Sequence, residues 1–75
     1  MHTETTTSLR GEVRAEMARQ GITRQTLADR TDISVWAIGR ALSGQRDFSL
    51  TEVLSIAAAL GLTASELVAR AERAA

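Results

Sequence analysis

The chain has 75 residues and no cysteine, and its nine basic and nine acidic side chains cancel to a formal net charge of zero. This length allows one domain that buries only about 60% of the surface exposed by the unfolded chain, so we expect dimerisation to add to its stability. The lack of cysteine excludes disulfides, cysteine-bound zinc and thiol chemistry. The longest apolar run, residues 56–60, is far shorter than the roughly 20 residues that span a membrane. We therefore expect a cytoplasmic protein that has no signal peptide and makes no membrane contact.

Residues 1–7 are polar and rich in threonine, and we expect them to form a flexible tail before a domain of residues 8–75. The only histidine, His2, lies in this tail without a second metal-binding side chain nearby, so we interpret it as solvated. Hydrolytic catalysis needs a nucleophile, a base and an orienting group within reach of one another. Because the carboxylates are dispersed over solvent-facing positions, we predict no enzymatic activity, no metal site and no cofactor.

A first helix is predicted from about Ser8 to Gln20, and Gly21 is expected to end it. Its apolar residues recur every four positions, which places them on one face toward the core. These residues are Leu9, Val13 and Met17. The face expected to meet water carries Arg10, Arg14 and Arg19.

Two short helical segments with a tight break between them follow in residues 21–44. Thr23 is predicted to cap the first and Ser34 the second, because a hydroxyl at this position accepts a hydrogen bond from a free backbone N–H. Thr31-Asp32 is expected to close the first segment, and Asp32 to turn the chain in the left-handed region, which aspartate enters at modest cost. Gly44 is expected to end the second segment. The inward-facing residues are Leu27, Ala28, Ile38, Ala41 and Leu42.

Capping boxes predict the starts of two more helices, at residues 49–52 (SLTE) and 63–66 (TASE). Gly61 is expected to end the first of these helices, and Phe48 is expected to fill the core just before it. The inward face of the fourth helix consists of Val53, Ile56, Ala57 and Leu60. Since no strand pattern is present, the sequence predicts an all-α fold with five helices.

The segment from Gly21 to Gly44 is similar to the helix-turn-helix of the lambda repressor/Cro-like (XRE) family. Leu27, the small Ala28 and the branched Ile38 match the family's pattern in this segment. The likeness continues through three further stretches, Ser43-Gly44, Ser49-Leu50 and residues 56–62 (IAAALGL). It covers roughly residues 9–68, and it implies a five-helix lambda-repressor-like DNA-binding domain whose helix-turn-helix is formed by helices two and three.

Many relatives place an arginine and a glutamate at the positions of Met17 and Leu42, where the two form a buried ion pair between helices one and three. Both positions are apolar in this chain. Replacing a buried ion pair by packed apolar side chains is often neutral or stabilising by about 1–4 kcal/mol. Because both partners differ together, we expect Met17 and Leu42 to pack in the core.

The resemblance implies that the outward face of the third helix reads base edges in the major groove. Arg40 is expected to form two hydrogen bonds with guanine, and Val35 and Trp36 to touch thymine methyl groups. The candidate base contacts are Ser34, Val35, Trp36 and Arg40. The candidate contacts with the phosphate backbone are Thr23, Arg24, Gln25, Ser43, Gln45 and Arg46.

Two residues of the third helix leave alternatives open. Trp36 is expected to contact DNA, to contact a protein partner or to fold back onto the domain. Gly39 costs about 1 kcal/mol relative to alanine inside a helix. One interpretation is that DNA or the Trp36 ring comes so close to Gly39 that a side chain there would clash. The other is that the glycine is only tolerated.

The zero net charge implies weak non-specific affinity for DNA. Residues 23–50 carry four arginines against three aspartates, a net charge of +1, and residues 51–75 carry two arginines against three glutamates, a net charge of −1. All nine basic residues are arginine, the type that forks onto guanine edges and phosphate oxygens.

Relatives bind two-fold DNA sites as dimers, so the resemblance implies a homodimer on an operator in double-stranded DNA. The candidates for the dimer contact are Leu62, Leu67, Val68 and Ala71, which alternatively cover the domain's own core. We predict a sequence-specific transcriptional regulator, of the small phage-type repressor or Cro-like kind. The alternatives are a restriction-modification controller and a protein-interaction module on the same fold, such as an antitoxin or antirepressor.

Overall fold

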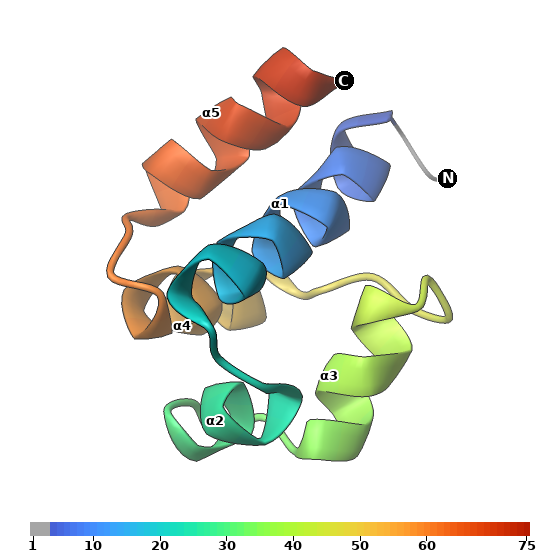
Figure 1. Ribbon diagram of the computed structural model, residues 1–75. Coiled ribbons are helices and arrows are strands. Elements are labelled where there is room, and N and C mark those ends of the chain that lie inside the picture. Colours follow the sequence, from blue (N-terminus) through green and yellow to red (C-terminus); the bar gives the residue numbers. More distant parts are fainter. Residues whose placement is uncertain (1–3) are drawn as a thin grey trace.

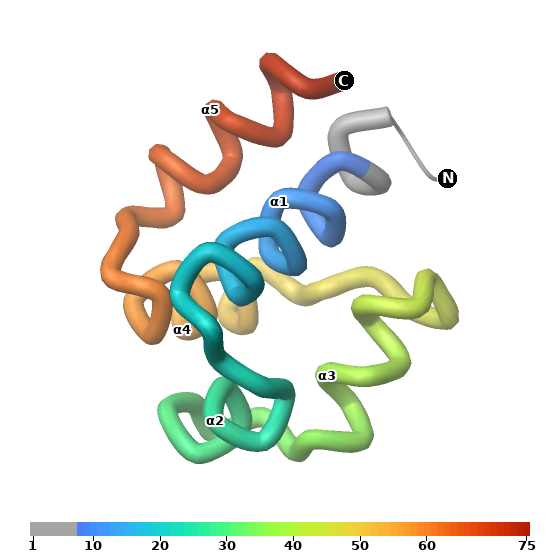
Figure 2. Tube along the Cα trace, in the orientation of Figure 1, coloured from blue at the N-terminus to red at the C-terminus, as the bar shows by residue number. Residues whose placement is uncertain are grey.

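The computed structural model describes residues 4–75, with the side chains of residues 8–75, and its regular structure is helical (Figure 1). The helices are α1 (Glu4–Gln20), α2 (Arg24–Asp29), α3 (Val35–Leu42), α4 (Leu50–Ala59) and α5 (Ala64–Ala74). No strand occurs in this part of the chain, so the predicted all-α, five-helix fold is confirmed. The chain path brings α5 back alongside α1, and α2 and α3 form the opposite end of the molecule (Figures 1 and 2).

The first helix begins earlier than predicted. It starts at Glu4 instead of about Ser8, so residues 4–7 of the expected tail are helical. Threonine has only moderate helix propensity, but adding residues to an established helix avoids the cost of nucleation. His2 and the rest of residues 1–3 lie outside the described residues.

One apolar core connects all five helices. It consists of Val13, Met17, Leu27, Ile38, Leu42, Val53, Ile56, Ala57, Leu60 and Leu67, with Phe48 and Leu9 partly buried against it. Met17 and Leu42 are 7% and 2% exposed, so the two positions that carry charges in many relatives are part of this core. Ile38, Ala41 and Leu42 turn the inner face of α3 toward the core, as predicted, and this arrangement leaves the other face of α3 outside.

The turn between α2 and α3 differs from the prediction. Asp32 does not adopt the left-handed conformation, because positive φ angles among the described residues occur only at glycines. The turn is closed instead by Thr31, whose Oγ1 donates to the Leu27 carbonyl at 2.9 Å and accepts from the Ile33 N–H at 3.2 Å. The threonine side chain therefore satisfies backbone groups on both sides of the turn.

The predicted ends of the two central helices are confirmed. The Thr23 hydroxyl accepts from the Thr26 N–H, and the Ser34 hydroxyl accepts from the Ala37 N–H, each at 3.1 Å. Gly44 ends α3 with a φ of 86°, and the Gln45 N–H then donates to the Arg40 carbonyl at 2.9 Å. Since glycine adopts this conformation without a Cβ clash, the chain turns sharply at the end of α3.

Both predicted capping boxes are present, at Ser49 with Glu52 and at Thr63 with Glu66. The second box sets the direction of α5, which packs along α1. As a result, Leu67 and Ala71 are only 1% and 0% exposed within this chain. The prediction that these two residues form a dimer contact is therefore wrong, because they are sealed in the domain's own core.

The remaining two predicted dimer residues, Leu62 and Val68, are partly buried and pack against the same core. Among the described residues, no single helix is long and apolar enough to cross a membrane. Only α4 and α5 taken together reach that length and composition, and they are bent by 102° at the break between them.

Candidate nucleic-acid interface

The outer face of α3 is exposed to solvent and carries two large apolar side chains. Trp36 is 69% exposed and Val35 is 40% exposed. The alternative in which Trp36 folds back into the domain is thus excluded by its exposure. Both side chains are therefore available to a partner that approaches from outside.

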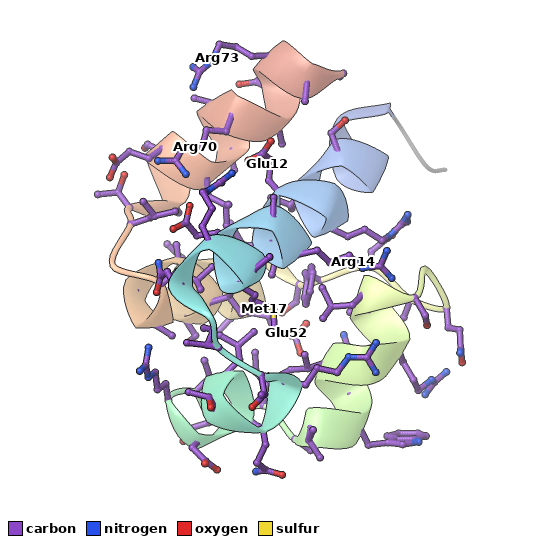
Figure 3. All side chains as sticks on the ribbon, viewed as in Figure 1. Glu12, Arg14, Met17, Glu52, Arg70 and Arg73 are labelled. Atoms are coloured by element: carbon purple, nitrogen blue, oxygen red, sulfur yellow. The ribbon has the colours of Figure 1, made fainter. Side chains whose placement is uncertain are left out.

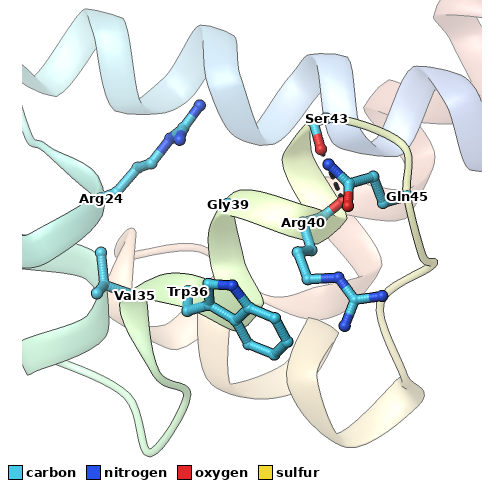
Figure 4. Close-up of a pocket in the computed structure, with 7 residues that line it drawn as sticks. All are labelled: Arg24, Val35, Trp36, Gly39, Arg40, Ser43 and Gln45. Atoms are coloured by element: carbon cyan, nitrogen blue, oxygen red, sulfur yellow. Dashed lines mark hydrogen bonds between the residues drawn. The ribbon is translucent and has the colours of Figure 1, made fainter.

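Seven residues line an open depression along this face (Figure 4). They are Arg24, Val35, Trp36, Gly39, Arg40, Ser43 and Gln45. Arg24 comes from the first turn of α2, Gln45 follows the end of α3, and the others belong to α3 or its cap. The fold therefore brings three predicted base contacts of α3 together with three predicted backbone contacts, one of which comes from α2.

The charge of the depression is positive although the whole chain is neutral. Two arginines and no acidic residue are among the seven that line it. On another side of the molecule, between α1 and α5, arginines lie beside glutamates (Figure 3). Glu16 accepts from Arg70 and Gln20, each at 2.8 Å, and forms an ion pair with Arg19 at 3.0 Å. Because the charges are distributed unevenly, a chain of zero net charge still has a positive surface that can bind an anion.

The guanidinium of Arg40 lies over the ring of Trp36, with its Cζ atom 4.7 Å from the ring centroid. The two residues are four positions apart on α3, the spacing that places side chains on the same face of a helix. This cation–π contact holds a charged, forked donor group against an exposed aromatic ring. Sequence reasoning assigned both residues to DNA but did not predict that they contact each other.

The guanidinium of Arg24 lies against Gly39. A Cβ atom built on Gly39 would be 3.3 Å from Nη1 of Arg24, and the Trp36 ring is not within 4 Å of it. The glycine therefore makes room for Arg24, which neither of the predicted reasons included. The Arg24 side chain extends from α2 and ends beside α3 near Gly39 (Figure 4).

Arg46 is directed away from the depression and into the protein. Its Nη1 and Nη2 atoms form two hydrogen bonds with the Glu52 carboxylate, at 2.9 and 3.0 Å, and Nη2 also donates to the Ala37 carbonyl at 3.2 Å. The hydrogen bonds with Glu52 raise the pKa of Arg46, and those with Arg46 lower the pKa of Glu52. The guanidinium thus joins α3 to α4. Arg46 and Glu52 are six residues apart with a loop between them, so no helical spacing in the sequence indicates that they pair.

Three further predicted contacts, Thr23, Gln25 and Ser34, are not among the residues that line the depression, whereas Ser43 is. Gln25 donates to the Asp29 carboxylate at 2.9 Å, and the Ser43 hydroxyl donates to the Arg40 carbonyl at 3.1 Å. Thr23 and Ser34 act as helix caps, and Ser34 lines a separate hollow with residues of α4. All four side chains are at exposed positions, so these local bonds leave them accessible from outside.

Arg10 is a further cation near the end of α3 that the sequence reasoning placed in water. It is partly buried, and its Cζ atom is 3.4 Å from the position of a Cβ on Gly44. A cation is favourable beside the last carbonyls of a helix because the helix dipole is negative there. The first helix therefore supplies a charge at the end of α3 that only the tertiary structure reveals.

A family model described as helix-turn-helix matches residues 13–67. Among curated proteins, no match to the chain is found. The matched range contains α2, α3 and the turn between them, with the depression on the outer face of α3. By this match and by its five-helix fold, the chain belongs to the lambda repressor/Cro-like (XRE) helix-turn-helix family, whose members are DNA-binding regulators.

Proposed function

We propose that this protein is a sequence-specific transcriptional regulator that inserts α3 into the major groove of an operator, as a small phage-type repressor or Cro-like protein. The observation that carries this proposal is the depression on α3, where Arg24 and Arg40 flank an exposed Trp36 and no acidic residue is present. A major groove about 12 Å wide accepts one helix, and arginine reads guanine there. A positive, exposed helix face is the surface that such docking requires.

The residues divide into two groups in this proposal. Ser34, Val35, Trp36 and Arg40 contact base edges. Thr23, Arg24, Gln25, Ser43 and Gln45 contact phosphates and fix the register. We no longer include Arg46 among the phosphate contacts. To reach a phosphate it would have to break its two hydrogen bonds with the Glu52 carboxylate, and it would only replace one anionic partner by another.

We also propose a homodimer, as expected for half-sites about 34 Å apart on one side of the duplex. Leu67 and Ala71 are buried, so of the predicted dimer residues only the partly buried Leu62 and Val68 are left for the contact. We add two apolar residues of α4 that are more exposed. Leu50 and Leu54 lie one turn apart on α4 and are 75% and 54% exposed. A second copy of this chain is the occupant that fits them, since a domain of this size gains stability from dimerisation and a two-fold operator aligns two identical surfaces.

A second candidate function is a protein-interaction module on the same fold, such as an antitoxin or antirepressor. The observation that favours it is the apolar pair Val35 and Trp36 on the exposed face, in a chain without net charge. In this case the depression would bind a protein side chain instead of a base edge. The restriction-modification controller remains a variant of the DNA-binding proposal, since it uses the same surface.

Selection of binding sites from random double-stranded DNA tests the proposal directly. A regulator is expected to enrich one sequence, and fluorescence anisotropy is then expected to show affinity that falls as salt rises. Arg24→Ala and Arg40→Ala are expected to weaken binding while circular dichroism shows an intact fold. Arg73→Ala is the matched control, because Arg73 lies on α5 at the other end of the molecule. Failure to enrich any sequence, with no effect of either variant, would favour the protein-interaction module.

A further inference from the structure

We propose that Trp36 and Arg40 act as one reading unit that recognises two adjacent base pairs, a guanine and a thymine beside it. This inference rests on the proposed function and adds the sequence that the site selects. It starts from the cation–π contact, in which Cζ of Arg40 is 4.7 Å from the centroid of the Trp36 ring. The ring is 69% exposed, so the contact lies on the surface that would face the DNA.

The plane of the Arg40 guanidinium determines where the Trp36 ring lies. An arginine that binds both O6 and N7 of guanine holds its planar fork in the plane of that base. A ring stacked on the guanidinium then lies at the level of the neighbouring base pair. The spacing is suitable, because 4.7 Å accommodates the duplex rise of about 3.4 Å together with a lateral offset of about 3 Å.

The groups that the neighbouring base presents in the major groove decide whether it can pack on the ring. Adenine and cytosine present amino donors in the major groove, and guanine presents two acceptors. The face of an indole ring accepts an N–H only weakly and donates nothing to an acceptor. A donor that loses water without gaining a partner is costly. Thymine presents its C5-methyl group, which packs on an apolar ring. The ring therefore selects a methylated pyrimidine next to the guanine that Arg40 binds.

The contact with Trp36 also restricts the Arg40 side chain before DNA binds. A free arginine side chain has many rotamers and loses them when it binds. Here the indole restrains the guanidinium before DNA arrives, and Gly39 between the two residues adds no side chain that would displace it. Trp36 is thus a contact for one base and a positioning residue for the next.

The test uses the full chain and the site that it selects from random duplexes. The enriched site is expected to contain a thymine–guanine neighbour pair. Two changes of single atoms or groups in the DNA then separate the roles. Deoxyuridine in place of the thymidine removes only the methyl group, and 7-deazaguanine removes only the N7 acceptor.

For the unchanged protein, the loss of the methyl group is expected to weaken binding about four-fold, and the loss of N7 about ten-fold. Trp36→Ala is expected to abolish the response to deoxyuridine and also to reduce the response to 7-deazaguanine. Arg40→Ala is expected to abolish the second response. Trp36→Phe, which keeps a ring face, is expected to restore both responses in part. Because Trp36 is the only tryptophan, its emission is also expected to change in Arg40→Ala without DNA.

Two results would contradict the proposal that Trp36 and Arg40 act together. One is an enriched site without the neighbour pair, and the other is a response to 7-deazaguanine that Trp36→Ala leaves unchanged. Both leave sequence-specific binding in place, so the proposed function would survive. If no sequence is enriched and neither variant changes affinity, the proposed function fails and this inference fails with it.

Discussion

Arg24 and Gly39 are in close approach across the helix-turn-helix, with Nη1 of Arg24 3.3 Å from the site of a missing Cβ. A glycine inside a helix is destabilising relative to alanine, so its presence in α3 calls for a reason. In this structure the space beside Gly39 is taken up by a guanidinium that comes from α2. The residue that lowers the helix propensity of α3, Gly39, thus lies beside Arg24, a proposed phosphate contact.

Gly39→Ala is expected to raise stability and weaken DNA binding at the same time. The gain in helix propensity is about 1 kcal/mol, and the atom in the way is the flexible end of Arg24, which moves at little cost. Chemical denaturation and anisotropy measure the two effects. In an Arg24→Ala background, the same substitution is expected to keep its gain in stability and have no effect on affinity. An equal loss of affinity in both backgrounds would mean that DNA itself approaches Gly39.

Arg46→Ala is expected to lower the free energy of unfolding by about 2 kcal/mol, since it removes the charged partner and two hydrogen bonds of the partly buried Glu52 carboxylate, which keeps only the bond from the Ser49 N–H. Affinity for DNA per folded molecule is expected to stay the same, because Arg46 is not a proposed phosphate contact. Arg46→Lys, which keeps the charge but not the fork, is expected to recover part of the stability. Denaturation followed by anisotropy at a temperature where the variant is folded makes the comparison. A large loss of affinity in the folded variant would return Arg46 to the interface.

Stability is expected to fall in acid through Glu16. Hydrogen bonds from Gln20 and then Arg19 lower the pKa of Glu16 from 4.5 to about 2 in the folded protein. A carboxyl group with a lowered pKa stabilises the fold above its unfolded pKa, and this stabilisation is lost as the pH falls toward the folded value. The window is therefore pH 4.5 to 2.

Urea denaturation across that window measures the effect. Glu16→Gln is expected to reduce the slope of stability against pH, whereas Glu72→Gln at the exposed end of α5 serves as the control. Identical slopes for the original protein and Glu16→Gln would show that Glu16 is not the titrating group.

Thr31→Val is expected to destabilise the fold by about 1 kcal/mol or more, because it removes the hydroxyl that bonds the Leu27 carbonyl and the Ile33 N–H. Thr31→Ser keeps the hydroxyl and is expected to remain near the original stability. Asp32→Ala is expected to have little effect, since Asp32 does not adopt a left-handed conformation. Thermal unfolding ranks the three variants, and the opposite order for Thr31→Val and Asp32→Ala would contradict this account of the turn.

Leu54→Glu is expected to convert the proposed dimer into a folded monomer, because it places a charge in an apolar contact between copies. Sedimentation velocity measures the change, with Ser65→Glu at an exposed position of α5 as a control for added charge. Leu67→Ala is expected instead to cost about 2–5 kcal/mol of stability, since it opens a cavity in the core. A Leu54→Glu protein that stays dimeric would exclude α4 from the contact.

The sequence by itself determined the features that depend on residues within about four positions of one another. The caps at Thr23 and Ser34, the two capping boxes and the glycine at the end of α3 were all predicted, because each is a bond between near neighbours in the chain. The inward face of α3 followed from helical periodicity in the same way. The start of α1 was missed, and the turn after α2 was placed correctly at Thr31-Asp32 but assigned to a left-handed Asp32 instead of to the Thr31 hydroxyl. Both features are local, but several residue types compete for those positions.

Only the tertiary structure decided which elements share a surface. It placed Arg24 over Gly39, joined Arg46 to Glu52 and turned Leu67 into the core instead of toward a second copy. The apolar pattern of α5 is the same whether it covers α1 or another chain, so periodicity alone cannot distinguish the two. A side chain as long as arginine reaches several neighbours, and the packing of the helices selects which one it meets.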